Sequence, residues 1–219
     1  MSLTLIILIF TVGVSLLALN DSTNSYFYKL RHHPYTEFRQ NQYYRWLTSS
    51  LLHADYMHLG INMLVFYQFG SVVESVFVDF FGTSTGRILY LVVYLGSVIA
   101  GDIPSYLKHK HDENYAAIGA SGGVAGIMFA YALFAPTSVI RLYAIIPLYT
   151  IVWAVLYLLY EQWAGRRGQD NIGHDAHFYG AVFGFICTAI MIPQAFPHFI
   201  TQIMDLVSGN NWYANRCLN

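Results

Sequence analysis

Long apolar segments separated by shorter polar stretches dominate the pattern of this chain. A helix that crosses a lipid bilayer needs about 20 mostly apolar residues. By this criterion the sequence predicts six spanning helices, at residues 3–19, 57–78, 87–107, 117–135, 139–163 and 174–196. The remaining pattern predicts a long aromatic and charged connection typical of the membrane interface, two polar loops and a tail without strong periodicity, at residues 20–56, 108–115, 164–173 and 197–219.

The composition favours a membrane protein. Of the 219 residues, 56% are hydrophobic and 11% are charged, whereas about a quarter are charged in ordinary soluble domains. From Ala116 to Tyr160 the only Lys, Arg, Asp or Glu is Arg141, so a soluble fold would lack a solvated face there. A net charge of -1 provides no electrostatic footprint for nucleic acid. We therefore expect an all-α, polytopic membrane protein that forms a single domain over residues 1–219.

Four polar side chains stand inside the predicted spans, where such groups are costly and are functional candidates by default. His58 and Asn62 lie near the start of the second span, Ser121 near the start of the fourth and His177 near the start of the sixth. Alternate helices of a six-span bundle cross the bilayer in the same direction. We therefore expect these four side chains to converge at one depth, below one membrane surface.

Small residues at every fourth position indicate which helices pack closely. The sixth span carries the stripe Ala176, Gly180, Gly184 and Thr188, and the fourth carries Gly122, Gly126 and Ala130. If these stripes face each other, Ser121 and His177 lie within hydrogen-bond reach. Helix packing alone also explains the stripes, with Ser121 bonded to a backbone carbonyl. The matching depth of His58 and Asn62 favours a chemical site over that simpler interpretation.

The four side chains are suited to acyl transfer. A serine becomes nucleophilic when a neighbouring base accepts its proton, and neutral imidazole is the usual base near neutral pH. Ser121 and His177 would form such a dyad. Asn62, His58 and the backbone N–H of Ser121 are hydrogen-bond donors of the kind that stabilise the oxyanion formed after attack on a carbonyl.

Three motifs, in this order and in these spans, resemble the rhomboid intramembrane serine proteases. They are His53-x4-His58-x3-Asn62, Gly119-Ala120-Ser121-Gly122 and Ala176-His177-x2-Gly180-x3-Gly184. The resemblance implies Ser121 as nucleophile, His177 as base, and His58 and Asn62 as oxyanion-stabilising groups. It implies hydrolysis of peptide bonds in or beside transmembrane segments of single-span or other membrane proteins. It also implies a six-helix, multi-pass protein in the cell membrane of a prokaryote, in contact with lipid and working without cofactor or metal.

The chain departs from the family pattern in two respects. Many members carry an aromatic residue four positions after the serine, where it packs on the catalytic imidazole, but here Ala125 stands there. Phe129 and Tyr179 are the alternative supports for His177, and the sequence does not choose between them. In addition, the family orientation places most Lys and Arg in the outer connections, against the positive-inside rule.

Several other polar residues suggest different sites. Asp175 invites a Ser-His-Asp triad, but side chains two positions apart on a helix face different directions, which favours a carboxylate at a helix start. His53, His109, His111 and His174 suggest a metal, yet no H-E-x-x-H motif occurs and no carboxylate completes a ligand set on one helix. A catalytically inactive rhomboid-like protein that binds membrane clients is the main alternative function, and a small transporter or channel is a further one.

Overall fold

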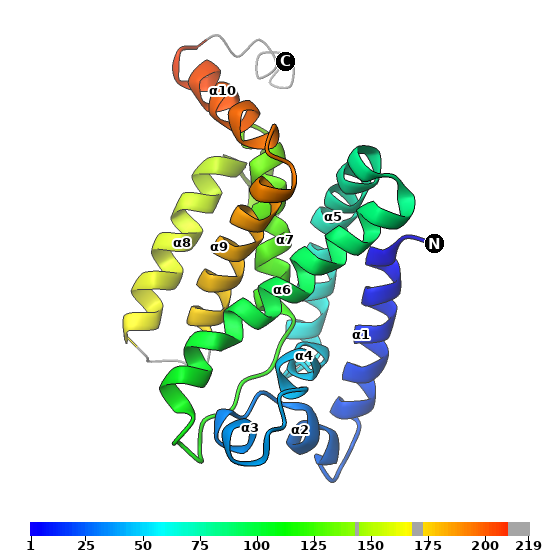
Figure 1. Cartoon of the computed structure of the whole chain (residues 1–219). Coiled ribbons are helices and arrows are strands. Elements are labelled where there is room, and N and C mark those ends of the chain that lie inside the picture. Colours follow the sequence, from blue (N-terminus) through cyan, green and yellow to red (C-terminus); the bar gives the residue numbers. More distant parts are fainter. Residues whose placement is uncertain (143–144, 168–172, 210–219) are drawn as a thin grey trace.

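Helices make up most of the computed structural model, which describes residues 1–142, 145–167 and 173–209 (Figure 1). The long helices are α1 (Leu3–Leu19), α5 (Tyr56–Phe81), α6 (Thr83–His109), α7 (Ser121–Phe134), α8 (Thr150–Arg167), α9 (His174–Met191) and α10 (Ala195–Val207). The short elements between α1 and α5 are α2 (Ser25–Leu30), α3 (Pro34–Gln40), α4 (Arg45–Thr48) and η1 (Ser49–Leu51).

Two of the described helices, α5 and α6, are long and apolar enough to cross a membrane by themselves. A third candidate span is the pair α9 and α10, which pass the same criterion together but bend by 112° at their junction. Helices α1 and α7 are apolar but shorter. The structure is thus a mostly helical one with two or three candidate spans.

The predicted helix at 139–163 is wrong in its first half. Strand β1 (Val139–Leu142) pairs antiparallel with β2 (Ile146–Tyr149), and α8 begins only after this hairpin. β-Branched residues such as Val139 and Ile140 favour extended backbone, and Pro147 cannot donate the N–H that a helix interior requires. The all-α prediction therefore missed this two-stranded hairpin.

The tail predicted without periodicity contains a helix. Helix α9 ends at Met191, two residues before Pro193, and α10 then leads away from it (Figure 1). The apolar residues of α10 recur at helical spacing, at Phe196, Phe199, Ile200 and Ile203. In addition, α8 extends through Arg167 into the predicted loop at 164–173. Residues 168–172 of that loop and 210–219 of the tail lie outside the described residues.

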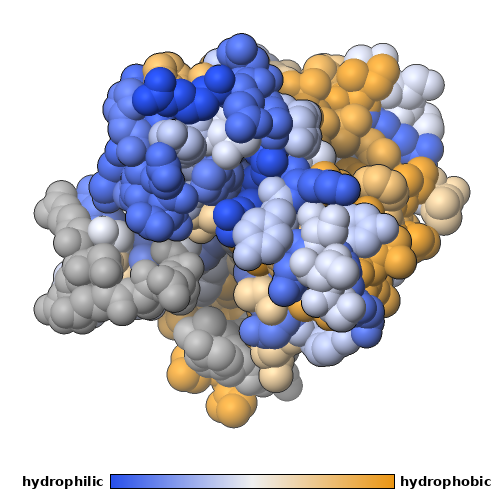
Figure 2. Space-filling model, turned by 90° about the horizontal axis from the view of Figure 1, so that it is seen from below, coloured by the Kyte–Doolittle hydropathy of each residue, from blue (hydrophilic) through white to orange (hydrophobic). Residues whose placement is uncertain are grey.

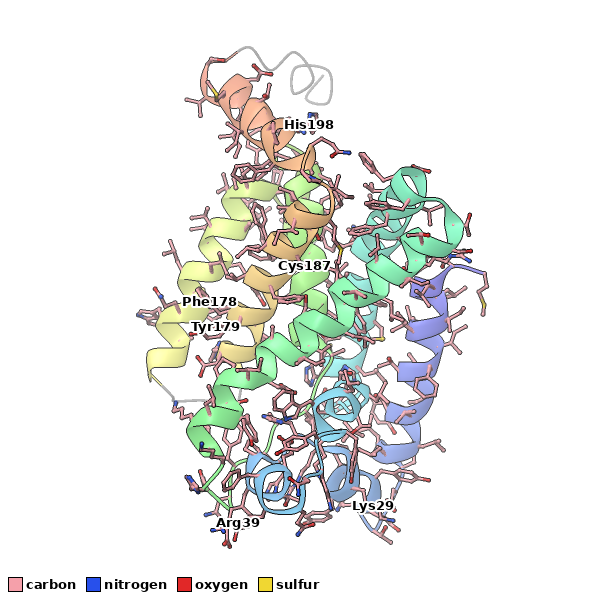
Figure 3. The ribbon with its side chains drawn as sticks, in the orientation of Figure 1. Lys29, Arg39, Phe178, Tyr179, Cys187 and His198 are labelled. Atoms are coloured by element: carbon pink, nitrogen blue, oxygen red, sulfur yellow. The ribbon has the colours of Figure 1, made fainter. Side chains whose placement is uncertain are left out.

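The first connection folds into short helices at one end of the bundle. Figure 2 shows this end, where hydrophilic side chains cover most of the view and hydrophobic ones flank it. Lys29 and Arg39 lie at this end, whereas His198 on α10 lies at the other (Figure 3). Arg45 is buried, and its guanidinium donates to the carbonyl oxygens of Tyr28 at 2.9 Å and Arg31 at 3.1 Å. This arginine thereby ties α4 to the backbone around α2.

A buried carboxylate on α5 holds the start of α1. Glu74 accepts hydrogen bonds from the backbone N–H groups of Leu3 at 2.7 Å and Thr4 at 2.8 Å, and from the Thr4 hydroxyl at 2.7 Å. Arg87 on α6 donates to the same carboxylate at 3.0 Å. Because the first N–H groups of a helix have no partner within it, Glu74 satisfies two of them and neutralises its own charge with Arg87.

The two glycine stripes face each other, as the sequence predicts. A Cβ atom built on Gly180 would overlap the backbone carbonyl of Gly122, and one built on Gly184 would overlap that of Gly126. Helices α7 and α9 thus touch backbone to backbone, in the way that small residues permit in membrane proteins. This contact fixes the positions of the residues at the starts of both helices, including Ser121 and His177.

Candidate active site

A cavity of about 660 Å³ opens among the starts of α5, α7 and α9. These three helices all begin toward the end of the bundle that carries α2 to α4 (Figure 1). The polar side chains that line the cavity are Ser49, Asp55, His58, Asn62, Asp102, Ser121 and His177. The four residues predicted from the sequence therefore share one cavity.

Ser121 and His177 are in direct contact. Ser121 is the first residue of α7, and its Oγ atom lies 2.6 Å from Nε2 of His177 in the first turn of α9. The side chain of His177 is 16% exposed, so the imidazole is largely removed from bulk solvent but still borders the cavity. The predicted hydrogen bond between these helices is confirmed.

The His58 imidazole presents a donor toward Ser121. Asp55 caps α5 by accepting the His58 backbone N–H at 2.7 Å, and the Ala54 N–H donates to Nδ1 of His58 at 3.4 Å. Because Nδ1 accepts a hydrogen bond, the proton of the neutral ring is on Nε2. A Cβ built on Gly119 would lie 3.4 Å from that Nε2 and 3.5 Å from the Ser121 Oγ, so both groups border the same small space.

Gly119 itself has a backbone conformation that favours glycine. Its φ is 130°, in the region that L side chains rarely adopt. A side chain there would also press on the His58 ring, whose Cε1 lies 3.2 Å from the Cβ position. Gly119 therefore lets the chain turn sharply into α7 and keeps the space beside Ser121 open.

Asn62 lies one helical turn after His58 on α5. It is 7% exposed, and its Nδ2 donates to the carbonyl oxygen of His58 at 3.2 Å. This bond uses one of the two amide protons and fixes the orientation of the side chain. The second N–H remains to serve a group in the cavity.

Sequence reasoning missed Glu161, which lies beside His177. Its Oε1 atom is 3.0 Å from Nδ1 of His177, and its Oε2 atom is 2.5 Å from Nδ1 of His174. The carboxylate is 4% exposed. A Glu inside an apolar segment indicates a function, because burying its charge is costly. Glu161, however, lies near the end of the predicted span at 139–163, where a charged residue is also expected at the membrane boundary.

The support for His177 comes mainly from α8. Tyr157 stacks near the imidazole, with ring centroids 6.4 Å apart and ring planes 28° apart. Phe129, one of the two predicted alternatives, packs on Tyr157 with centroids 5.9 Å apart. Tyr179, the other, is 46% exposed. An aromatic residue of α8 thus packs on His177 in this chain, which has Ala125 on α7.

Residue types that bind metals also meet at this place. Within the described part of the chain, Glu161, His174 and His177 offer ligand atoms that lie within 4.8 Å of one another. A search for ligands along one helix could not find this set, because the carboxylate comes from α8 and the imidazoles from α9. Asp175 lies in the first turn of α9, as expected for a carboxylate at a helix start.

Comparison with known proteins gives the family. The rhomboid domain matches residues 40–194, more than half of the chain. The chain belongs to the rhomboid family. YdcA of Bacillus subtilis (strain 168) is 27% identical over 156 residues, which are 70% of this chain and 69% of YdcA. The rhomboid protease GluP of the same bacterium is 27% identical over 157 residues, or 71% of this chain and 28% of GluP. The rhomboid protease GlpG of Haemophilus influenzae is 27% identical over 101 residues, or 46% of this chain and 44% of GlpG.

A rhomboid domain implies a polytopic helical membrane fold, and the resemblance drawn from the three motifs is confirmed at the level of the family. The chain spans less than half the length of GluP and of GlpG. All three relatives carry the words rhomboid protease in their names.

A second buried polar network of this rhomboid adjoins the cavity. Nδ1 of His32 lies 2.8 Å from Glu37 Oε1, and Nε2 lies 2.9 Å from the Ser105 hydroxyl. Because Ser105 can donate its own proton to the Asp102 carbonyl at 2.9 Å, its oxygen can accept a hydrogen bond from Nε2 of His32. His32 also exchanges backbone hydrogen bonds of 3.0 Å with Ala117, which lines the cavity.

The surroundings of His32 agree with its charged form. Burial by itself would lower the pKa of His32, but the hydrogen bond to Glu37 and the negative charges of Asp102 and Glu37 outweigh it, so the pKa is raised above its ordinary 6.5. This charged group connects the first connection to the segment that precedes Ser121.

Proposed function

We propose that this protein is an intramembrane serine protease that crosses the cell membrane of a prokaryote six times and cleaves peptide bonds in or next to transmembrane segments of other membrane proteins. The observation that carries the proposal is the 2.6 Å contact between Ser121 Oγ and His177 Nε2 inside a polar cavity of an otherwise apolar bundle. Polar groups are retained at such depth when they have a function.

The reaction begins with attack of Ser121 Oγ on the scissile carbonyl carbon. The hydroxyl proton passes to Nε2 of His177, and the carbonyl π electrons move onto oxygen. The Nε2–H of His58, the free N–H of Asn62 and the backbone N–H of Ser121 are the donors for that oxyanion. Collapse breaks the C–N bond, and His177 returns the proton to the leaving amine. Water, activated by the same imidazole, then hydrolyses the acyl-enzyme.

The substrates would be single-span or other membrane proteins. In a spanning helix the backbone carbonyls are engaged in hydrogen bonds, so the segment has to unwind before Ser121 can reach one. Unwound backbone is tolerated at membrane depth only where it lines a wet cavity, and the polar cavity supplies such a place. No cofactor enters the proposed reaction.

The proposal is tested by incubating the purified protein in liposomes with a panel of single-span substrates. We expect cleavage by the wild type and none by Ser121→Ala or His177→Ala. The matched controls are Ser75→Ala, an exposed serine on α5, and His198→Ala on α10, both of which should cleave like the wild type.

A fluorophosphonate probe separates a protease from an inactive client-binding protein. Ser121 Oγ would attack the phosphorus, fluoride would leave, and the serine proton would pass to His177. Labelling of the wild type that disappears in Ser121→Ala supports the protease. An unlabelled wild type that still retains membrane proteins would overturn the proposal in favour of the client-binding alternative.

A further inference from the structure

The Glu161 carboxylate is enclosed between two imidazoles. Its two oxygens lie 3.0 Å from Nδ1 of His177 and 2.5 Å from Nδ1 of His174, and its side chain is 4% exposed. A carboxylate buried among apolar helices is costly unless donors hold it. Both oxygens therefore face a donor, and each histidine ring is fixed by one of them.

The contact with Ser121 determines where the proton of His177 lies. To accept the hydroxyl proton, Nε2 must carry a lone pair, so in the neutral ring the hydrogen is on Nδ1. That Nδ1–H donates to Glu161. The carboxylate thus selects the tautomer in which His177 can act as a base, and it holds the ring plane toward Ser121.

We propose that Glu161 is the positioning residue of a Ser121–His177–Glu161 triad, with His174 holding the second carboxylate oxygen. This inference rests on the proposed function and extends the serine–histidine dyad that the sequence predicts. Glu161 takes no proton in the reaction. It orients the neutral imidazole and stabilises the imidazolium that forms when Ser121 attacks.

The groups around His177 leave this role to Glu161. The imidazole faces Glu161 and Tyr157 from α8 and Ser121 from α7. The His58 side chain of α5 lines the same cavity, and the neighbouring imidazole on α9 is that of His174. Among these groups, Glu161 is the carboxylate. It is therefore the anion that compensates a positive charge on His177.

The decisive variant is Glu161→Gln, which keeps the size and removes the charge. An amide has one acceptor oxygen, so it cannot accept from both His174 and His177, and its NH₂ group must face one of them. The readout is fluorophosphonate labelling, followed over time. A positioning role lowers the rate constant of labelling and leaves its final amplitude unchanged, whereas misfolding lowers the amplitude.

We expect the labelling rate and kcat to fall about a hundredfold to ten-thousandfold in Glu161→Gln, with KM little changed, because the equivalent change in a soluble serine protease costs about ten-thousandfold. Glu161→Asp should restore part of the rate. The matched control is Glu74→Gln, a carboxylate equally buried at 4% exposure but far from the site in the fold, which should lose stability and keep the wild-type labelling rate.

A metal centre is the competing use of the same residues. Treatment of the wild-type protein with EDTA leaves its labelling rate unchanged if Glu161 acts by hydrogen bonding. Loss of labelling that added Zn²⁺ restores would overturn the inference, as would a Glu161→Gln variant that labels at the wild-type rate. Either result leaves the protease proposal intact, since that proposal is tested separately, by comparing cleavage and labelling of the wild type with those of Ser121→Ala.

Discussion

The backbone of Gly184 in α9 rests directly on the backbone of Gly126 in α7, with no room for a side chain on Gly184. The same backbone-to-backbone contact continues to Gly180 and Gly122. This contact between α7 and α9 therefore determines the distance between Ser121 and His177.

A methyl group at position 184 should therefore disturb the site from a distance. Overpacking of this kind typically costs about 1–3 kcal/mol, and we expect Gly184→Ala to lower the free energy of unfolding by that amount and to slow fluorophosphonate labelling. Gly60→Ala on α5 is the control, because a Cβ there meets no atom within 4 Å. Equal labelling rates in the two variants would show that the glycine contact between α7 and α9 does not determine the Ser121–His177 geometry.

Glu74 should matter for stability and not for chemistry. Glu74→Ala leaves the N–H groups of Leu3 and Thr4 and the Arg87 guanidinium without their acceptor, and loss of one partner of a buried pair typically costs about 3–5 kcal/mol. Thermal unfolding in detergent should show a lower midpoint. Labelling of the protein that remains folded should proceed at the wild-type rate, and a slower rate would contradict this separation.

The charge on His32 predicts a specific pH dependence of stability. The pKa of His32 is raised in the folded protein by Glu37 and Asp102 against the opposing effect of burial, so protonation stabilises the fold. This contribution is present in full below the ordinary pKa of 6.5 and is lost as the pH rises through the raised folded value. In His32→Gln the contribution is absent at every pH.

Unfolding midpoints of wild type and His32→Gln should therefore differ more below the ordinary pKa of 6.5, and the difference should shrink as the pH rises through the raised folded value. The difference between the two proteins is the quantity to follow, because other groups titrate in both. A gap that stays constant across this range would show that His32 does not change its protonation there.

Asn62 should contribute to the rate more than to binding. Removal of one oxyanion donor typically lowers kcat about a hundredfold to a thousandfold, and we expect Asn62→Ala to do so with KM nearly unchanged. Gln68→Ala removes an exposed amide from the same helix and serves as the control. A rise in KM alone would assign Asn62 to substrate binding.

The sequence was sufficient to bring together four of the polar residues that line the cavity, namely His58, Asn62, Ser121 and His177. Their signal is strong because an imidazole or amide in an apolar span is costly, and because spans that enter from one face bring their first turns to one depth. The glycine stripes added the pairing of α7 with α9. Both arguments use the position of a residue within its own helix. The first also uses the fact that even-numbered spans all cross the bilayer in the same direction.

The role of Glu161 could not be read in the same way. Its partners His174 and His177 lie on another helix, and only the packing of α8 against α9 brings the carboxylate between them. The hairpin before α8 was missed for a different reason. A short, mostly apolar run such as Val139–Leu142, whose one charged residue is Arg141, has the same mean hydropathy in a strand as in a helix, so hydropathy alone does not distinguish the two.

The bend of 112° between α9 and α10 carries α10 to the end of the molecule opposite the first connection (Figure 1). The cavity lies toward the end where Lys29 projects, and His198 marks the other (Figure 3). In a variant whose native Cys187 and Cys217 are replaced by serine, single cysteines are introduced in place of Lys29 or His198. A thiol reagent that cannot pass the bilayer, applied to intact cells, would report which end faces outward. The end that reacts also shows whether the cavity opens toward the outside of the cell or toward the cytoplasm.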